Sequence, residues 1–292
     1  AITALGAIAF SGTALAAGGG GDPLAPYAEE GTYTTISESD GLSCTVYRPL
    51  NVPDNAPIIV WGNGTGASPS TYGSGLEHWA SWGYVVTAAD TSNPGTGEEM
   101  IDCLDRLQNA DYADSLDFSS VGTSGHSQGG GGSIMAGRDN RVAATAPMQP
   151  YTIGLGHDSS SQRQQNGPML LLSGGSDSIA GPALNQDPVF SRANVPVFYA
   201  TLDGASHFEP TGDFGGFAGI STAWWEYQLK GQQDLAELFN DTCTICDISE
   251  WDVEQKGNLV YSEKSVPAPS GGHFPSLPTD HPADSAPWHR LP

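Results

Sequence analysis

One glycine-rich stretch, GHSQGGGGS at residues 125–133, constrains the fold of this 292-residue chain more than any other feature. It follows the run SSVGTSG, typical of a strand, and precedes SIMAGR, which favours a helix. Ser127 has glycine two positions before it and two positions after it. A serine on a sharp strand-to-helix turn has an unfavourable backbone conformation, and side chains at Gly125 and Gly129 would collide there. We therefore predict a tight turn that presents the Ser127 hydroxyl, and not a flexible linker.

The helix after this turn would place its N-terminus beneath the serine. The positive end of the helix dipole would then lie where a negatively charged oxygen could form. Gly130 to Gly132 are expected to let the helix sit close against the sheet.

The rest of the chain alternates short apolar strands with helices. Most of the strands are apolar at successive positions, which indicates a parallel sheet covered by helices on both faces. Expected strands are residues 31–37, 44–49, 56–61, 83–90, 119–125, 142–148, 168–174 and 195–202; expected helices are 76–83, 98–110, 133–138, 219–229 and 232–239.

A serine on such a turn needs an acid and a base further along the chain. Asp177 follows the strand in PMLLLSGGSD, and His207 follows the strand in VPVFYATLDGASHF. Loops at the carboxyl ends of parallel strands can carry function. We predict that His207 accepts the Ser127 proton and that Asp177 holds the imidazole ring. Asp203 is the alternative acid.

Three other histidines compete for the role of base. His126 adjoins the serine and should point away from it across the turn. His78 lies in a helical segment, where a structural role is usual. His157 lies in a polar loop, and a role in substrate binding stays open for it.

Two more segments should reach the reacting centre. The loop WGNGTGAS follows the third strand, and its glycines would let backbone N–H groups approach the substrate. Tyr151 follows the strand after the elbow helix and should emerge at the same edge of the sheet as the serine. We expect Tyr151, His126 and Thr65 to contact the substrate.

Composition limits the classes of partner. The chain contains 10 Lys and Arg and 33 Asp and Glu, which gives a net charge of −23. This charge argues against binding to nucleic acid. The acidic excess predicts a well-solvated surface; a calcium site is the alternative, although no EF-hand-like run supports it. We expect no metal and no cofactor, an ester as the partner, and a monomer.

The two ends of the chain differ from the middle. Residues 1–21 are apolar and uncharged, contain Ala14-Leu15-Ala16, and resemble a truncated signal peptide followed by a glycine-rich linker. A membrane anchor or a buried strand is the alternative. Residues 22–257 would form the catalytic domain, and residues 258–292, rich in Pro and Ser, a disordered tail. We expect a secreted or periplasmic protein without a stable membrane anchor.

Four cysteines in an exported chain suggest two disulfides. Cys243 and Cys246 are close enough to pair locally, although C-x-x-C also occurs in redox and metal sites. Cys44 would then pair with Cys103. The chain-entropy model assigns about 4 kcal/mol to the longer loop and about 2 kcal/mol to the shorter one.

The chain resembles the α/β-hydrolases, and within them the secreted bacterial cutinase-like polyester hydrolases, which include poly(ethylene terephthalate) hydrolases. GHSQGGGGS, SGGSDSIAG, DGASHFEP and ATAPMQPY carry the resemblance, which extends from about Thr32 to about Trp251. It implies an α/β-hydrolase fold, a Ser127–His207–Asp177 triad, and an oxyanion hole built by the N–H groups of Gln128 and Thr65.

The chain departs from that family at several positions. Thr65 stands where an aromatic residue is usual, Gln128 where Met is usual, and Tyr151 where Trp is frequent; the Cys44–Cys103 pair is also not part of the usual pattern. These differences are compatible with an esterase, but they argue against an aromatic polyester as its substrate. About 17 residues separate ATAPMQP from GPMLLLSG, which leaves no room for a cap domain.

The leading hypothesis is a secreted serine carboxylic-ester hydrolase acting on polyester or cutin-like esters. A carbohydrate acetyl esterase of the acetylxylan type would use the same triad. An exported binding protein on an inactive hydrolase fold is the non-enzyme alternative.

Overall fold

The computed structural model describes residues 21–259, with the exception of residues 42 and 241. The predicted leader and the predicted tail therefore lie, apart from residues 21, 258 and 259, outside the described residues.

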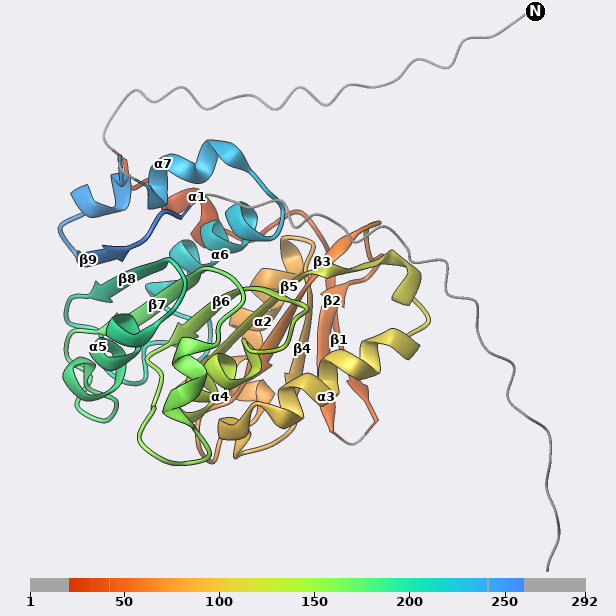
Figure 1. Cartoon of the computed structure of the whole chain (residues 1–292). Helices are drawn as coiled ribbons and strands as arrows, with labels where there is room; N and C mark the ends of the chain where they lie inside the picture. The colour runs from red at the N-terminus through yellow and green to blue at the C-terminus, as the bar shows by residue number, and fades with distance from the viewer. Residues whose placement is uncertain (1–20, 42, 241, 260–292) are drawn as a thin grey trace, which may run out of the picture. The chain divides into compact units, whose positions relative to one another are not determined.

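A mixed, mostly parallel sheet organises the described part of the chain (Figure 1). Its strands lie in the order β1-β2-β4-β3-β5-β6-β7-β8-β9. The run from β4 through β8 is parallel, whereas β2 is antiparallel to both neighbours and β9 is antiparallel to β8. The strands are β1 (Thr35–Asp40), β2 (Cys44–Pro49), β3 (Ala56–Gly62), β4 (Val85–Ala89), β5 (Leu116–His126), β6 (Val142–Met148), β7 (Met169–Gly174), β8 (Val197–Leu202) and β9 (Trp251–Lys256).

Helices cover both faces of this sheet, as the alternating apolar segments predict (Figure 1). One face packs against α1 (Ala25–Ala28), α2 (Gly73–Ser81), α6 (Phe217–Gln228) and α7 (Ala236–Phe239). The other packs against α3 (Glu98–Arg106), α4 (Gln128–Ala136) and α5 (Pro182–Arg192). β3 is buried along its whole length, because both of its faces are covered.

The predicted elements differ from the observed ones in four informative places. β1 begins at Thr35 and not at residue 31, and the last predicted helix, 232–239, is a 3₁₀ turn followed by the four-residue α7. Sequence analysis missed α5, which contains Pro182 and Pro188. It also missed β9, a polar edge strand whose pairing with β8 is decided by contacts distant in sequence.

The fold class predicted from the sequence is confirmed. Residues 149–168, which join β6 to β7 and are all described, contain the short 3₁₀ helix Ser159–Arg163 and no cap domain. Among the residues described, no helix has the length and apolar character needed to cross a membrane.

Two disulfides join elements of the described chain. Cys44 in β2 is bonded to Cys103 in α3, with Cα atoms 5.8 Å apart and 59 positions apart in sequence. Cys243 is bonded to Cys246. Both pairings are those predicted from the sequence, and the longer one ties α3 to an antiparallel strand near the edge of the sheet.

Candidate active site

The predicted tight turn at Ser127, a nucleophile elbow, lies between β5, which ends at His126, and α4, which begins at Gln128. Ser127 has φ 55° and ψ −119°, a conformation that L-residues rarely adopt. A Cβ on Gly125 would overlap the carbonyl of Gly129, and one on Gly129 would overlap the carbonyl of Gly62 at the end of β3. The two glycines are therefore required by close backbone approach on both sides of the serine.

Gly130, Gly131 and Gly132 lie in the first turns of α4, where added side chains would meet neighbouring backbone. Added Cβ atoms there would meet Pro150, the carbonyl of Tyr151 and the carbonyl of Pro94, respectively. A Cβ on Gly130 would also meet the Gly125 carbonyl in β5, so this glycine lets α4 sit close to the sheet, as predicted, whereas Gly131 and Gly132 let α4 approach the loops that follow β6 and β4.

Ser127, His207 and Asp177 form one hydrogen-bonded line. His207 Nε2 lies 2.9 Å from Ser127 Oγ, and His207 Nδ1 lies 2.8 Å from Asp177 Oδ2. A carboxylate only accepts, so Nδ1 carries the ring proton and Nε2 is left to accept from the serine hydroxyl. All three side chains are buried, at 8% exposed or less. The geometry is that of a nucleophile, a general base and an orienting carboxylate.

The surroundings of Asp177 keep it ionised. Burial by itself would raise the pKa of this carboxyl, but hydrogen bonds from His207 and from the N–H groups of Ala180 and Ile179 outweigh that effect and hold the pKa below its usual value. The two N–H groups each donate to Oδ1 over 2.8 Å. Oδ2 is thereby left to the imidazole.

The alternative acid and bases lie elsewhere or are engaged with other groups. Asp203 is exposed, and the His207 ring bonds Asp177 instead. His78 bonds Thr222 and the Tyr27 carbonyl. These contacts make His78 a structural residue of the buried helical face.

His157 and His126 are also held by the protein. His157 bonds the Gly131 carbonyl and the Gln162 side chain, so it braces the loop after β6. The His126 ring bonds Tyr72 Oη and the His207 carbonyl and is buried among these protein partners.

The two predicted oxyanion donors are the backbone N–H groups of Gln128 and Thr65. Gln128 is the first residue of α4, so its N–H has no intrahelical acceptor. Thr65 lies in the loop after β3 and lines the same pocket as Ser127. The Thr65 hydroxyl donates to Gln128 Oε1 over 2.8 Å, which ties the two candidate donors together. Gln128 Nε2 in turn donates to the Leu155 carbonyl over 3.0 Å.

A cavity of about 350 Å³ opens beside this line of residues. Thr65, His126 and Tyr151, the predicted substrate contacts, all line it. Gly64 and Ala67 belong to the loop WGNGTGAS, which was predicted to reach the reacting centre. The lining residues that were not predicted are Thr71, Tyr72, Leu155, Ile179, Phe208 and Thr211, although Ile179 and Phe208 follow Asp177 and His207 by two positions and one position and could have been found on that ground.

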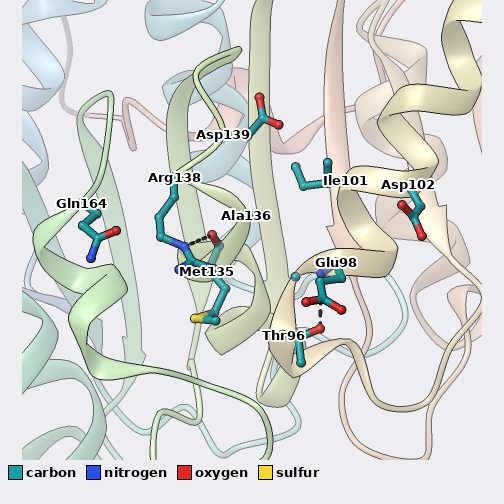
Figure 2. A pocket seen from close by; sticks show the side chains of 10 residues that line it. Thr96, Glu98, Ile101, Asp102, Met135, Ala136, Arg138, Asp139 and Gln164 are labelled. Atoms are coloured by element: carbon teal, nitrogen blue, oxygen red, sulfur yellow. Dashed lines mark hydrogen bonds between the residues drawn. The ribbon is translucent and has the colours of Figure 1, made fainter.

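A second pocket, of about 410 Å³, lies between α3 and the end of α4 (Figure 2). Glu98, Ile101 and Asp102 line one side, and the Arg138 guanidinium bonds the Met135 carbonyl on the other. Its lining shares no residue with the cavity at Ser127. In the described part of the chain, no three His, Cys, Asp or Glu side chains gather as a metal site would require.

The fold and this geometry define an α/β-hydrolase with a serine–histidine–aspartate site. The model of the PET hydrolase-like family, PETase, matches residues 24–238. The chain belongs to this family.

Curated relatives agree with that assignment. Cutinase est2 of Thermobifida alba is 32% identical over 180 residues, 57% of each chain. The bis(hydroxyethyl) terephthalate hydrolase of Streptomyces coelicolor is 26% identical over 190 residues, 62% of this chain and 60% of the relative. Cutinase 1 of Thermobifida cellulosilytica is 27% identical over 177 residues, 57% of this chain and 65% of the relative. The chain thus spans less than two thirds of the length of these relatives.

Proposed function

We propose that this protein is a secreted serine carboxylic-ester hydrolase that cleaves polyester or cutin-like esters through an acyl-enzyme. The observation that carries the proposal is the Ser127–His207–Asp177 line on a strained elbow beside an open cavity. The family and the names of the relatives supply the substrate class, since these relatives are called cutinases and a bis(hydroxyethyl) terephthalate hydrolase.

In the acylation step, Ser127 Oγ attacks the ester carbonyl carbon while its proton passes to His207 Nε2. The carbonyl oxygen becomes negatively charged and accepts hydrogen bonds from the N–H groups of Gln128 and Thr65. The C–O bond to the alcohol then breaks, and the leaving alkoxide takes the proton from His207. Asp177 keeps Nδ1 protonated and stabilises the positive ring.

In the deacylation step, a water molecule takes the place of the alcohol. His207 accepts one water proton as the oxygen attacks the acyl carbon, and the Ser127 oxygen leaves with that proton. The carboxylic acid is released, and the enzyme returns to its starting state.

The rim of the cavity favours a bulky or polymeric ester. Large exposed apolar side chains lie on the loops that carry the site and on the first turn of α5, and exposed apolar patches usually mark interaction sites. Ile153 and Leu184 lie on adjoining segments, because the Thr152 N–H donates to Asn185 Oδ1 over 2.9 Å. The exposed side chains are Ile153 (51%), Leu155 (50%), Ile179 (51%), Leu184 (70%) and Phe208 (62%).

Export is part of the proposal. Two disulfides suit an oxidising compartment and are rare in the cytosol. The apolar first segment of the chain points the same way.

The test has two parts. A serine-directed fluorophosphonate should label the wild-type protein and leave Ser127→Ala unlabelled. A substrate panel of p-nitrophenyl acetate, a longer-chain ester, acetylated xylan, an aliphatic polyester film and bis(hydroxyethyl) terephthalate then assigns the substrate class. We expect the polyester and longer esters to be cleaved; activity confined to acetylated xylan would favour a carbohydrate esterase, and absence of labelling would favour an inactive binding protein.

A further inference from the structure

The histidine that precedes the nucleophile has no part in the proposed chemistry, yet it lies at the centre of the site. His126 is 3% exposed. Its Nδ1 lies 2.9 Å from Tyr72 Oη, and its Nε2 lies 2.7 Å from the backbone carbonyl oxygen of His207. The rings of His126 and His207 are 4.7 Å apart between centroids. Both ring nitrogens are therefore used by the protein and not by a substrate.

The partners of His126 leave a single arrangement of protons. A backbone carbonyl only accepts, so Nε2 must carry a proton and donate to His207. In the neutral ring Nδ1 is then an acceptor, and Tyr72 must donate its hydroxyl proton to it. The Gly64 N–H donates to the Tyr72 oxygen over 3.0 Å. A continuous chain of hydrogen bonds runs from Gly64 through Tyr72 and His126 to the carbonyl of His207.

The neutral state of His126 is secured by its surroundings. Burial, and after it the neighbouring His207, lower the pKa of His126 to about 3, against the smaller opposing effects of the His207 carbonyl and Asp177. The ring therefore keeps one tautomer throughout the neutral range.

The two ends of this series of hydrogen bonds lie at the proposed oxyanion hole and at the proposed catalytic base. Gly64 directly precedes Thr65, whose N–H we assign to the oxyanion hole. At the other end, the loop before the base is held at three successive carbonyls, those of residues 205–207. They accept from Ser176 N–H over 2.9 Å, Gln149 Nε2 over 2.8 Å and His126 Nε2 over 2.7 Å. The ends of β5, β6 and β7 thus each supply one donor to the base loop.

We propose that His126 and Tyr72 form a positioning pair that couples the oxyanion loop to the catalytic base. The inference rests on the proposed function and deepens it. The pair acts by fixing the distance between the Thr65 N–H and the His207 ring, and it touches no reacting atom. A misplacement of about 1 Å in such a constellation costs roughly 100-fold in rate.

Tyr72→Phe tests the coupling with the smallest change in volume. We expect kcat for p-nitrophenyl acetate to fall roughly 10- to 100-fold, with KM changed less than about 3-fold. The matched control is Tyr84→Phe, which also removes a hydroxyl from a fully buried tyrosine, one that donates to Glu226 over 2.8 Å. This control should lose stability while kcat of the folded protein stays at the wild-type value.

His126→Gln and His126→Leu extend the test. Glutamine retains a donor for the His207 carbonyl and should keep more of kcat than leucine does. His78→Gln is the control, because His78 is another buried histidine with two protein partners, outside the site. It should leave kcat unchanged.

A measurement independent of activity completes the design. Nitrogen-15 NMR of the histidine rings should show His126 as the Nε2–H tautomer, without titration, between pH 5 and 8. An Nδ1–H tautomer, or a titration in that range, would overturn the assignment. Wild-type kcat in Tyr72→Phe, alongside an inactive Ser127→Ala, would refute the coupling and leave the hydrolase intact; a fully active Ser127→Ala would refute the hydrolase itself.

Discussion

The carboxyl edge of the sheet and the aromatic core beneath it are built in opposite ways. At the edge, Ser127 and Gln149 have positive φ values of 55° and 43°, and buried polar side chains bond one another or backbone carbonyls. Strain of this kind costs about 1–3 kcal/mol for each residue. In the core between the sheet and α2 and α6, Trp79 lies 4.5 Å from Phe214 and 5.9 Å from Trp225, between ring centroids. The core stabilises the fold, and the edge uses part of that stability to hold strained groups in place.

The largest effect that we expect is a loss of activity from a substitution at the carboxyl edge of the sheet. Ser127→Ala should lower kcat by a factor on the order of 10⁶, because the three residues act as a unit. Stability should change by less than about 1.5 kcal/mol, since the change removes one hydrogen bond. Ester hydrolysis and thermal unfolding of the same preparation measure both quantities. Turnover that survives the substitution would contradict the proposed mechanism.

The reverse pattern is expected in the core. Trp79→Ala should reduce the free energy of unfolding by about 3–5 kcal/mol through the cavity it leaves. The kcat of the molecules that remain folded should stay within about 2-fold of wild type. Chemical denaturation gives the first quantity and active-site titration the second. Leu184→Ala, at a side chain that is 70% exposed, is the control and should leave stability unchanged.

The two disulfides should contribute unequally to stability. Replacing Cys44 and Cys103 together by alanine should lower the free energy of unfolding by about 4 kcal/mol, and replacing Cys243 and Cys246 should lower it by about 2 kcal/mol, because the longer loop restricts the unfolded chain more. Denaturation of the two double variants tests the ranking. Equal losses would show that native-state contacts, and not loop length, set the contribution of each bond.

Low pH should reduce the stability of the fold through its buried histidines. Burial is the main cause that lowers the pKa of His126, from 6.5 to about 3, and it also lowers those of His78 and His157. Between pH 6.5 and 3 the unfolded chain binds protons that folded His126 does not, so stability falls as the pH falls through this window. For His126 the slope within this window is about 1.4 kcal/mol per pH unit.

Denaturation at a series of pH values measures this slope. His126→Gln should make it shallower than in the wild type. An unchanged slope in that variant would contradict the assignment of a neutral, buried His126.

The smallest predicted effect concerns the cavity wall. Tyr151 lines the cavity at Ser127, and its ring can stack on an extended acyl group, worth about 0.5–1.5 kcal/mol. Tyr151→Ala should therefore weaken kcat/KM for a bulky ester about 2- to 10-fold and for an acetyl ester less. Tyr33→Ala, at a tyrosine that is 40% exposed and outside this cavity, serves as the control. Equal losses on both esters, with a lower melting temperature, would make Tyr151 a structural residue.

Local signals in the sequence predicted much of this molecule. The glycines around Ser127 indicate a turn, because only close backbone approach demands them, and apolar runs of five to eight residues indicate strands buried on both faces. The order of serine, aspartate and histidine along the chain singled out Asp177 and His207. The strands at 44–49 and 142–148 have the predicted bounds.

The elements missed are those whose stability comes from distant partners. β9 alternates polar and apolar residues only weakly, and it becomes a strand because β8 offers a free edge. α5 contains two prolines, which as a local signal favour a break in a helix, and packing of Val189 against the sheet holds it.

The sequence by itself was enough to predict the fold class and the candidate triad, because a strained serine turn and its partners leave marks in residue type and order. Only the tertiary structure decided what His126 and Tyr72 do. Tyr72 is 54 positions from His126, and the carbonyl of His207 is another 81 positions away, so no local pattern records their contact. Hydrogen bonds between residues so distant depend on the three-dimensional register of β3, β5 and the loop after β8, which the packing of the whole sheet sets.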